Sequence, residues 1–153
     1  MVVSDTTTLI ILSDLERFEL LSNLFSHIII PQAVHHELNA KTQTTLPPFI
    51  TIQKCTQEKS IQALTQLLDR GESEAITLAV ELGTGLIIDE KKGRKIAMNK
   101  GVKIIGLLGI ITLNIQRGHI TKSQAHAFLE DALTHGYRIN TALIEEMFSR
   151  WEK

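Results

Sequence analysis

Residues 1–12, MVVSDTTTLIIL, and residues 85–95, GLIIDEKKGRK, each place an acid where an apolar run gives way to a helical pattern. Short runs rich in Val and Ile are typical of buried parallel strands. A carboxylate at the end of such a strand is costly to bury unless it binds a metal ion or a hydrogen-bond network. Because α/β folds place their sites at the carboxyl edge of the sheet, we expect Asp5 and Asp89 to meet there.

Length, composition and charge limit the classes of protein to consider. A chain of 153 residues predicts a single domain over residues 1–153, and a net charge of −1 gives no global field that would attract nucleic acid. The single cysteine, Cys55, excludes an internal disulfide and fits a reducing compartment. Neither a signal-peptide pattern nor an apolar run of ~18 residues is present, so we expect a cytoplasmic protein without a membrane segment.

Strand-like and helix-like patterns alternate along the chain. This alternation predicts a layered α/β fold on a mostly parallel sheet. The polar stretch 40–48 predicts a loop, residues 49–54 predict an edge strand, and Gly83 suits a helix C-cap. Strands are expected at 1–5, 27–30, 49–54, 85–89 and 102–105, and helices at 9–23 (one or two), 31–39, 60–68, 72–82, 91–100, 107–116, 122–134 and 141–151.

Two of the expected helices carry further acids. Glu37 lies three residues after Val34 on the inner face of the helix that follows the second strand. Glu72 shares a stripe with small residues such as Ala75, whereas Glu74 lies on a stripe that we expect to be more solvated. We therefore rank Glu72 above Glu74 and keep both, because acids at helix starts are also ordinary caps.

Several phrases resemble those of PIN-domain proteins. Two of them, GLLG (106–109) and GYRI (136–139), narrow the resemblance to a prokaryotic subfamily close to VapC-type toxins. The resemblance implies a three-layer fold, with a small, mostly parallel sheet of four to five strands and helices on both faces. It also implies an endoribonuclease that needs Mg²⁺ or Mn²⁺, often dimerises and is silenced by a protein antitoxin. The phrases are VSDTTTLI (3–10), IPQAVHHEL (30–38), GESEAI (71–76), IDEKKGR (88–94), GLLG (106–109) and GYRI (136–139).

The resemblance assigns roles to individual residues. Many toxins of this type carry aspartate at the third acidic position, so a glutamate there allows for a weakened or inactive enzyme. Thr6 or Thr7 would orient a ligand or a water molecule. The catalytic and metal-binding acids would be Asp5, Glu37, Glu72 and Asp89, with Glu74 and Glu90 as the alternative register.

The chemistry of RNA hydrolysis explains this set of residues. Phosphodiester cleavage needs an activated water and neutralisation of charge on the phosphate, and Mg²⁺ prefers hard oxygen ligands. Basic side chains after Asp89 would contact the RNA backbone, although a solvated helix face explains them equally well. Arg94 is the best candidate, because guanidinium binds phosphate in a bidentate fork. The basic residues are Lys91, Lys92, Arg94 and Lys95.

Other functions and contacts stay open. The chain could be a PIN-like protein that binds nucleic acid or a partner without turnover, or a flavodoxin-like regulatory domain. Adjacent His35, His36 and Glu37 offer zinc-ligand chemistry, but neighbouring helical residues point about 100° apart. An apolar stripe at residues 61, 64, 67 and 68 either packs in the core or forms a homodimer contact.

Overall fold

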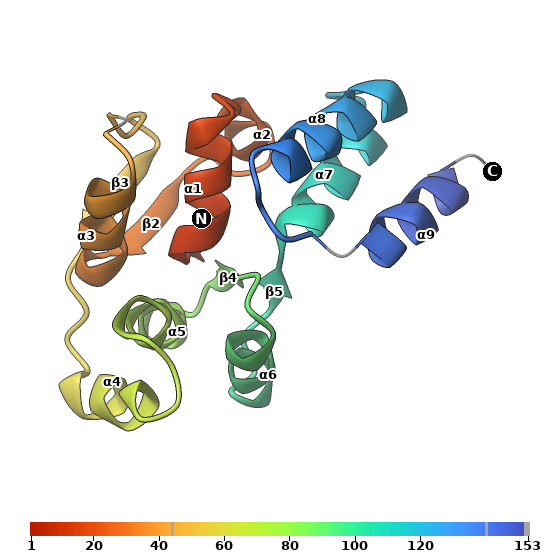
Figure 1. The fold of residues 1–153 in the computed structure, drawn as a ribbon. Helices are drawn as coiled ribbons and strands as arrows, with labels where there is room; N and C mark the ends of the chain where they lie inside the picture. The colour runs from red at the N-terminus through yellow and green to blue at the C-terminus, as the bar shows by residue number, and fades with distance from the viewer. Residues whose placement is uncertain (44, 140, 152–153) are drawn as a thin grey trace.

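A computed structural model describes residues 1–43, 45–139 and 141–151. The strands among these residues form a five-stranded sheet (Figure 1). The strand order is β3-β2-β1-β4-β5, and each neighbouring pair is parallel. This arrangement confirms the predicted α/β fold with a parallel sheet. The strands are β1 (Val2–Ser4), β2 (Ile28–Pro31), β3 (Ile50–Gln53), β4 (Gly85–Ile87) and β5 (Ile104–Ile105).

The helices connect the strands and cover both faces of the sheet, with α5 and α6 on one side and α1, α2, α7 and α8 on the other (Figure 1). The expected C-cap Gly83 is confirmed, because it ends α5 with φ +67°, a left-handed conformation that glycine adopts readily. The helices are α1 (Thr6–Asp14), α2 (Glu19–Ser22), α3 (Gln32–Lys41), α4 (Glu58–Thr65), α5 (Arg70–Leu82), α6 (Lys91–Asn99), α7 (Leu107–Gln116), α8 (Lys122–Thr134) and α9 (Thr141–Trp151).

The structure decides two expectations about the helices. The expectation that Pro31 begins a helix was wrong, because Pro31 ends β2 and caps α3 in an extended conformation. The apolar stripe at residues 61, 64, 67 and 68 runs from α4 into the turn that follows it. Of its two alternatives, the core is the one observed, since Ile61, Leu64 and Leu68 are buried and only Leu67 of the stripe is exposed, at 55%. The stripe therefore offers no continuous apolar surface for a homodimer.

Burial follows the position of each strand in the sheet. All residues of the central strands β1 and β2 are buried, as expected for strands covered on both faces. In β3, by contrast, only Ile50 is buried, which confirms the predicted edge strand. Among the described residues, no helix combines the length and apolar character needed to cross the hydrocarbon layer of a membrane.

The parallel strands bring separate parts of the chain to one edge of the sheet. Asp5 follows β1, α3 follows β2, and Asp89 lies two residues after β4. The Asp5 amide donates to the Ile87 carbonyl at 2.9 Å, which holds the end of β1 against the end of β4. Acids from distant parts of the chain thus share this carboxyl edge.

Candidate functional site

Asp5 lies at the centre of the carboxyl edge and is only 3% exposed. It is the N-cap of α1, and its Oδ1 accepts a hydrogen bond from the Thr6 amide at 2.7 Å. Burial raises the pKa of Asp5, the Thr6 amide lowers it, and the negative charges of Asp69, Glu37 and Asp89 raise it, so that it lies at about 7. Asp5 is therefore surrounded by other carboxylates.

Glu37 reaches this edge from α3. Its Oε2 accepts a hydrogen bond from the Thr6 hydroxyl at 2.7 Å. Its Oε1 lies against the backbone of Gly71 at the start of α5, so close that a Cβ at residue 71 would overlap it. Glu37 therefore sits between the first turns of α1 and α5.

Asp89 is held on the other side of α1. Its Oδ2 accepts from the Thr8 hydroxyl at 2.6 Å, and its Oδ1 accepts from the Leu107 amide at 2.9 Å. A Cβ at Gly106 would lie 2.6 Å from both Asp89 Oδ1 and a terminal nitrogen of Arg94. Because residue 106 is glycine, the carboxylate and the guanidinium can both lie close to the chain there.

Glu72 enters from the first turn of α5. Its Oε2 is buried and, among the described residues, has no hydrogen-bond partner. Burial, a hydrogen bond with the Asp69 carboxyl group and the negative charges of Asp69, Asp5 and Glu90 raise the pKa of Glu72. A Cβ at Gly93 would lie 2.9 Å from this Oε2, so Gly93 leaves space for the carboxyl group. A buried, unpaired carboxyl oxygen among acids is an arrangement that a cation would stabilise.

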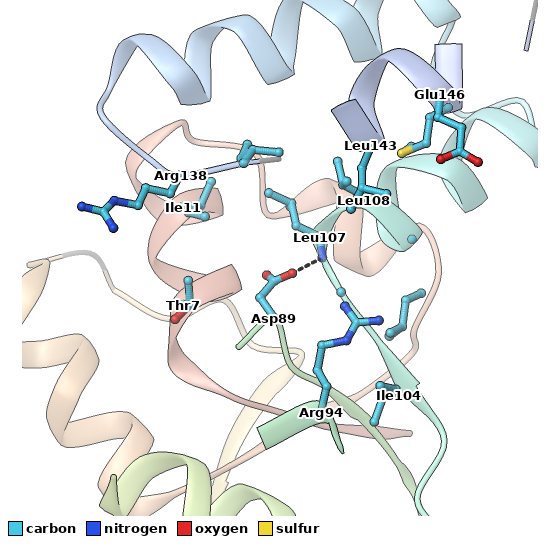
Figure 2. A pocket seen from close by; sticks show the side chains of 15 residues that line it. Thr7, Ile11, Asp89, Arg94, Ile104, Leu107, Leu108, Arg138, Leu143 and Glu146 are labelled. Carbon is cyan, nitrogen blue, oxygen red and sulfur yellow. Dashed lines mark hydrogen bonds between the residues drawn. The ribbon is translucent and has the colours of Figure 1, made fainter. Parts of the chain in front are cut away.

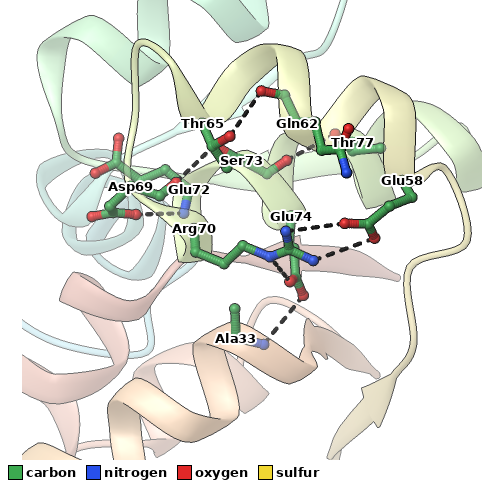
Figure 3. A network of polar contacts seen from close by, with 10 residues as sticks. All are labelled: Ala33, Glu58, Gln62, Thr65, Asp69, Arg70, Glu72, Ser73, Glu74 and Thr77. Carbon is green, nitrogen blue, oxygen red and sulfur yellow. Dashed lines mark hydrogen bonds and ion pairs between the residues drawn. The ribbon is translucent and has the colours of Figure 1, made fainter.

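Glu74, the alternative to Glu72, lies in a different environment (Figure 3). Its carboxylate accepts hydrogen bonds from Arg70 Nε at 2.5 Å and from the Ala33 amide at 3.2 Å. The expectation that Glu74 is solvated was wrong, because it is only 7% exposed and ties α5 to the start of α3. Glu74 therefore has the contacts of a structural ion pair.

Glu90, the other alternative acid, caps α6 by accepting from the Gly93 amide at 2.7 Å. Burial alone would raise the pKa of Glu90. Hydrogen bonds from the Gly93 and Lys92 amides, a hydrogen bond with the Glu72 carboxyl and the positive charge of the Lys92 side chain outweigh burial and hold this pKa below its ordinary value. Glu90 is thus an ionised cap beside the acids.

Asp69 and Thr8 belong to this edge but were not predicted from the sequence. Asp69 is the N-cap of α5, accepts from the Glu72 amide at 2.8 Å, and helps to raise the pKa values of Asp5 and Glu72. An aspartate three residues before a glutamate at a helix start is a capping pattern that could have indicated it. Thr8 contacts Asp89 through its hydroxyl, because Asp5 caps α1 and sets the position of its first turn.

Two of the four basic residues of α6 line hollows beside the acids. Arg94 is half-buried and lines the larger hollow together with Asp89 and Thr7. Lys92 is exposed and lines a smaller hollow together with Asp69, Glu72 and Glu90. Lys91 and Lys95 are exposed and line neither hollow.

The larger hollow has a volume of about 590 Å³ and opens beside Asp89 (Figure 2). We call it the Asp89 cavity. Arg138, which lies on its rim after α8, was not predicted from the sequence, because only the tertiary fold brings this segment to α1. The cavity is lined by Thr7, Ile11, Asp89, Arg94, residues 104–109, Arg138, Ile139 and α9.

The acids fit a hydrated divalent cation better than a cation bound by protein atoms alone. In the described parts of the chain, no three His, Cys, Asp or Glu side chains converge closely enough to hold one ion, and a zinc site at His35 and His36 is therefore not formed there. Mg²⁺ keeps several waters and needs only one or two direct carboxylate ligands. The unpaired Glu72 oxygen and the buried Asp5 carboxylate suit such an ion.

Comparison with known proteins agrees with this geometry. No individually curated protein shows a significant match to the chain. The PIN-domain family matches it over residues 1–153, and PIN domains are generally nucleases. This match removes the flavodoxin-like alternative. The chain therefore belongs to the PIN-domain family.

Proposed function

We propose that the protein is an endoribonuclease of PIN type that depends on Mg²⁺ or Mn²⁺ and acts in the cytoplasm as a single domain over residues 1–153. The observation that carries this proposal is the buried Asp5 carboxylate, which interacts electrostatically with other acids at the carboxyl edge. Glu37, Asp69 and Asp89 all raise its pKa, and Asp5 in turn raises that of Glu72. Such repulsion between carboxylates is retained at a cost, and a divalent cation would turn it into attraction.

Each acid would have a defined role. Asp5 and Asp89 would hold the metal directly, while Glu37 and Glu72 would act directly or through water molecules. When bound, the metal would neutralise the developing charge of the phosphate and make a water molecule more acidic. Thr6 and Thr8 would fix the orientations of Glu37 and Asp89 through their hydroxyl groups.

Basic side chains would hold the RNA beside these acids. Arg94 is the first choice, because its guanidinium lies next to Asp89 at Gly106. Lys92 would serve on the other side, where it borders Glu72 and Glu90. Lys91 and Lys95, which are exposed on the same helix, would add to the local positive field.

We further propose a toxin role, with a protein antitoxin that covers the acids. The resemblance to VapC-type toxins supports this role. An acidic, recessed site also suits a basic segment of a partner, which would displace both the metal and the RNA. The homodimer stays a prediction of that resemblance, since α4 does not supply its contact surface.

The second candidate is a PIN-like protein that binds nucleic acid without turnover. The favouring observation is that, within the described residues, no three acids are close enough to share one ion. Incubating single-stranded RNA with the chain, with and without Mn²⁺, separates the two functions. Metal-dependent cleavage supports the nuclease, and RNA binding without cleavage in Mn²⁺ or Mg²⁺ supports the second candidate.

A further inference from the structure

The Asp89 cavity is continuous with the proposed catalytic edge, because Asp89 belongs to both. Arg94 approaches it from α6, and Arg138 passes Ile11 on the side of α1 that carries Thr7 (Figure 2). Within the described part of the chain, neither guanidinium has an ion-pair or hydrogen-bond partner. Two cationic groups on the rim are thus available to an anionic ligand.

We propose that the Asp89 cavity receives one unpaired base of a single-stranded RNA, next to the phosphodiester that is cleaved. Arg94 and Arg138 would contact the backbone phosphates on the rim. This inference rests on the proposed ribonuclease function and adds to it a binding site for the substrate and a reason for selecting unpaired RNA.

The dimensions and walls of the cavity suit a nucleoside. Its volume of about 590 Å³ lies within the roughly 300–1,000 Å³ of small-molecule sites, which are mostly apolar with a few polar groups. Aliphatic side chains such as Ile105, Leu108 and Ile139 form the walls, whereas Asp89 and the Thr7 hydroxyl offer polar contacts. A planar base can pack on such walls and on the face of a guanidinium.

The charged side chains of the lining determine how the phosphate and the base of the nucleotide would be oriented in the cavity. Asp89 and Glu146 are the acids of the lining, and Glu146 lies on α9, at the end of the cavity away from Arg94 (Figure 2). Phosphate is therefore attracted to the two guanidinium groups on the rim, and the base is directed inward. In this orientation the backbone passes Asp89.

A recessed cavity also selects the state of the RNA. A base inside a duplex is paired and stacked, so it would have to lose its pairing and stacking before it could enter. A base in a single strand is already unpaired. The cavity therefore predicts tighter binding of single-stranded than of double-stranded RNA.

The test measures binding rather than cleavage. A fluorescein-labelled 12-nucleotide RNA, alone or annealed to its complement, is titrated with the 153-residue chain in EDTA, and anisotropy is recorded. Leu143 lines the cavity and is 48% exposed, so Leu143→Trp adds bulk at the opening without disturbing the core. Leu133→Trp is the matched control on α8, at a position that is 36% exposed and outside the lining.

We expect Leu143→Trp to weaken single-strand binding about tenfold and to abolish the preference over duplex, with no change for Leu133→Trp. Arg138→Ala should weaken binding several-fold and reduce the salt slope by about 0.7, as for one lost phosphate contact. Arg117→Ala, an exposed arginine at the end of α7, is its control and should change neither quantity.

The outcomes distinguish this proposal from the proposed function. If the wild type cleaves RNA in Mn²⁺ but Leu143→Trp binds both RNA forms as the wild type does, the cavity proposal is overturned and the nuclease stands. If cleavage is absent but Leu143→Trp still removes the single-strand preference, the cavity stands as an RNA site and the nuclease fails. Equal wild-type affinity for both RNA forms also overturns the cavity proposal.

Discussion

Glu72 and Glu74 are the same type of residue on the first two turns of α5, yet their surroundings are opposite. Glu74 receives hydrogen bonds from the Arg70 guanidinium and the Ala33 amide (Figure 3). Glu72 has one buried oxygen that lacks a partner among the described residues, and it lies among the charges of Asp69, Asp5 and Glu90. One carboxylate is stabilised by the protein, and the other is destabilised by it.

This difference separates structural from functional burial. A buried carboxylate with nearby donors contributes to the fold. Removing the Glu74 carboxylate would leave Arg70 Nε and the Ala33 amide without this acceptor, while the other guanidinium nitrogens of Arg70 keep their bonds to Glu58. A buried carboxylate among acids opposes the fold and is expected where another component, such as a cation, completes the site. Changes on the Glu74 side should therefore alter stability, and changes on the Asp5 and Glu72 side should alter activity.

The largest effect is expected from Asp5→Asn. The substitution removes a negative charge at nearly constant volume, so cleavage in Mn²⁺ should fall by about 10²–10³-fold. The free energy of unfolding without metal should stay the same or rise, because the repulsion from Glu37, Asp69 and Asp89 is relieved. Cleavage at the wild-type rate would show that the Asp5 carboxylate is not required for activity.

The pH dependence of stability tests the same side without RNA. The pKa of Asp5 is about 7 in the fold against 3.8 as its ordinary value, so the folded state binds the proton more tightly. This stabilisation is complete below pH 3.8 and is lost as the pH rises through about 7. Urea unfolding of the metal-free chain should show this group contributing a loss of about 2–4 kcal/mol over that range.

Asp5→Asn is the control for the pH experiment. It should remove most of this decrease, because asparagine does not titrate. A wild-type profile that stays flat between about pH 4 and 7 would show that Asp5 is not destabilised when ionised.

A paired substitution compares the two glutamates directly. Glu72→Gln should reduce cleavage by about 10–100-fold, because it removes an acid that would bind the metal, and it should cost little stability, because burial and the neighbouring acids disfavour the ionised carboxylate there. Glu74→Gln should lower the free energy of unfolding by about 1–2 kcal/mol, because the charge-assisted bond with Arg70 is lost. Urea titration and an RNA cleavage assay on both variants check this, and equal effects on cleavage would contradict the assignment.

The sequence was informative where the signal is local. Runs of Val and Ile predicted the strands, and a parallel sheet places the acids that follow β1 and β4 at the same edge. The C-cap Gly83 was equally predictable, because glycine favours the left-handed conformation that ends α5.

The sequence was less informative where neighbours from other elements decide. Helix periodicity suggested a solvated Glu74, but burial there depends on α3 and on the way Arg70 folds back over α5. Asp69 was not singled out from the sequence, because its closeness to Asp5 arises only when α5 packs on β1. Arg138 reaches the Asp89 cavity through contacts that no local pattern encodes.

The smallest effect, and the finest test, concerns Gly71, which lies between Arg70 and Glu72. A Cβ there would overlap the Glu37 carboxylate, the mobile end of a half-buried side chain. In Gly71→Ala the fold can therefore adapt by displacing that carboxylate from the Thr6 hydroxyl, and alanine favours the helix by about 1 kcal/mol. We expect stability to be kept while cleavage falls about tenfold, because sub-ångström placement of catalytic groups matters.

Gly118→Ala provides the opposite control for this test. Gly118 has φ +75°, and a Cβ added there would meet no described atom within 4 Å, so alanine should cost about 1 kcal/mol of stability and leave cleavage unchanged. Urea unfolding and cleavage rates measured on both variants decide the matter. If Gly71→Ala cleaves at the wild-type rate, the position of Glu37 against α5 has no part in the activity. Glu72 and Asp69 would then be the acids near the start of α5 that can still contribute to cleavage.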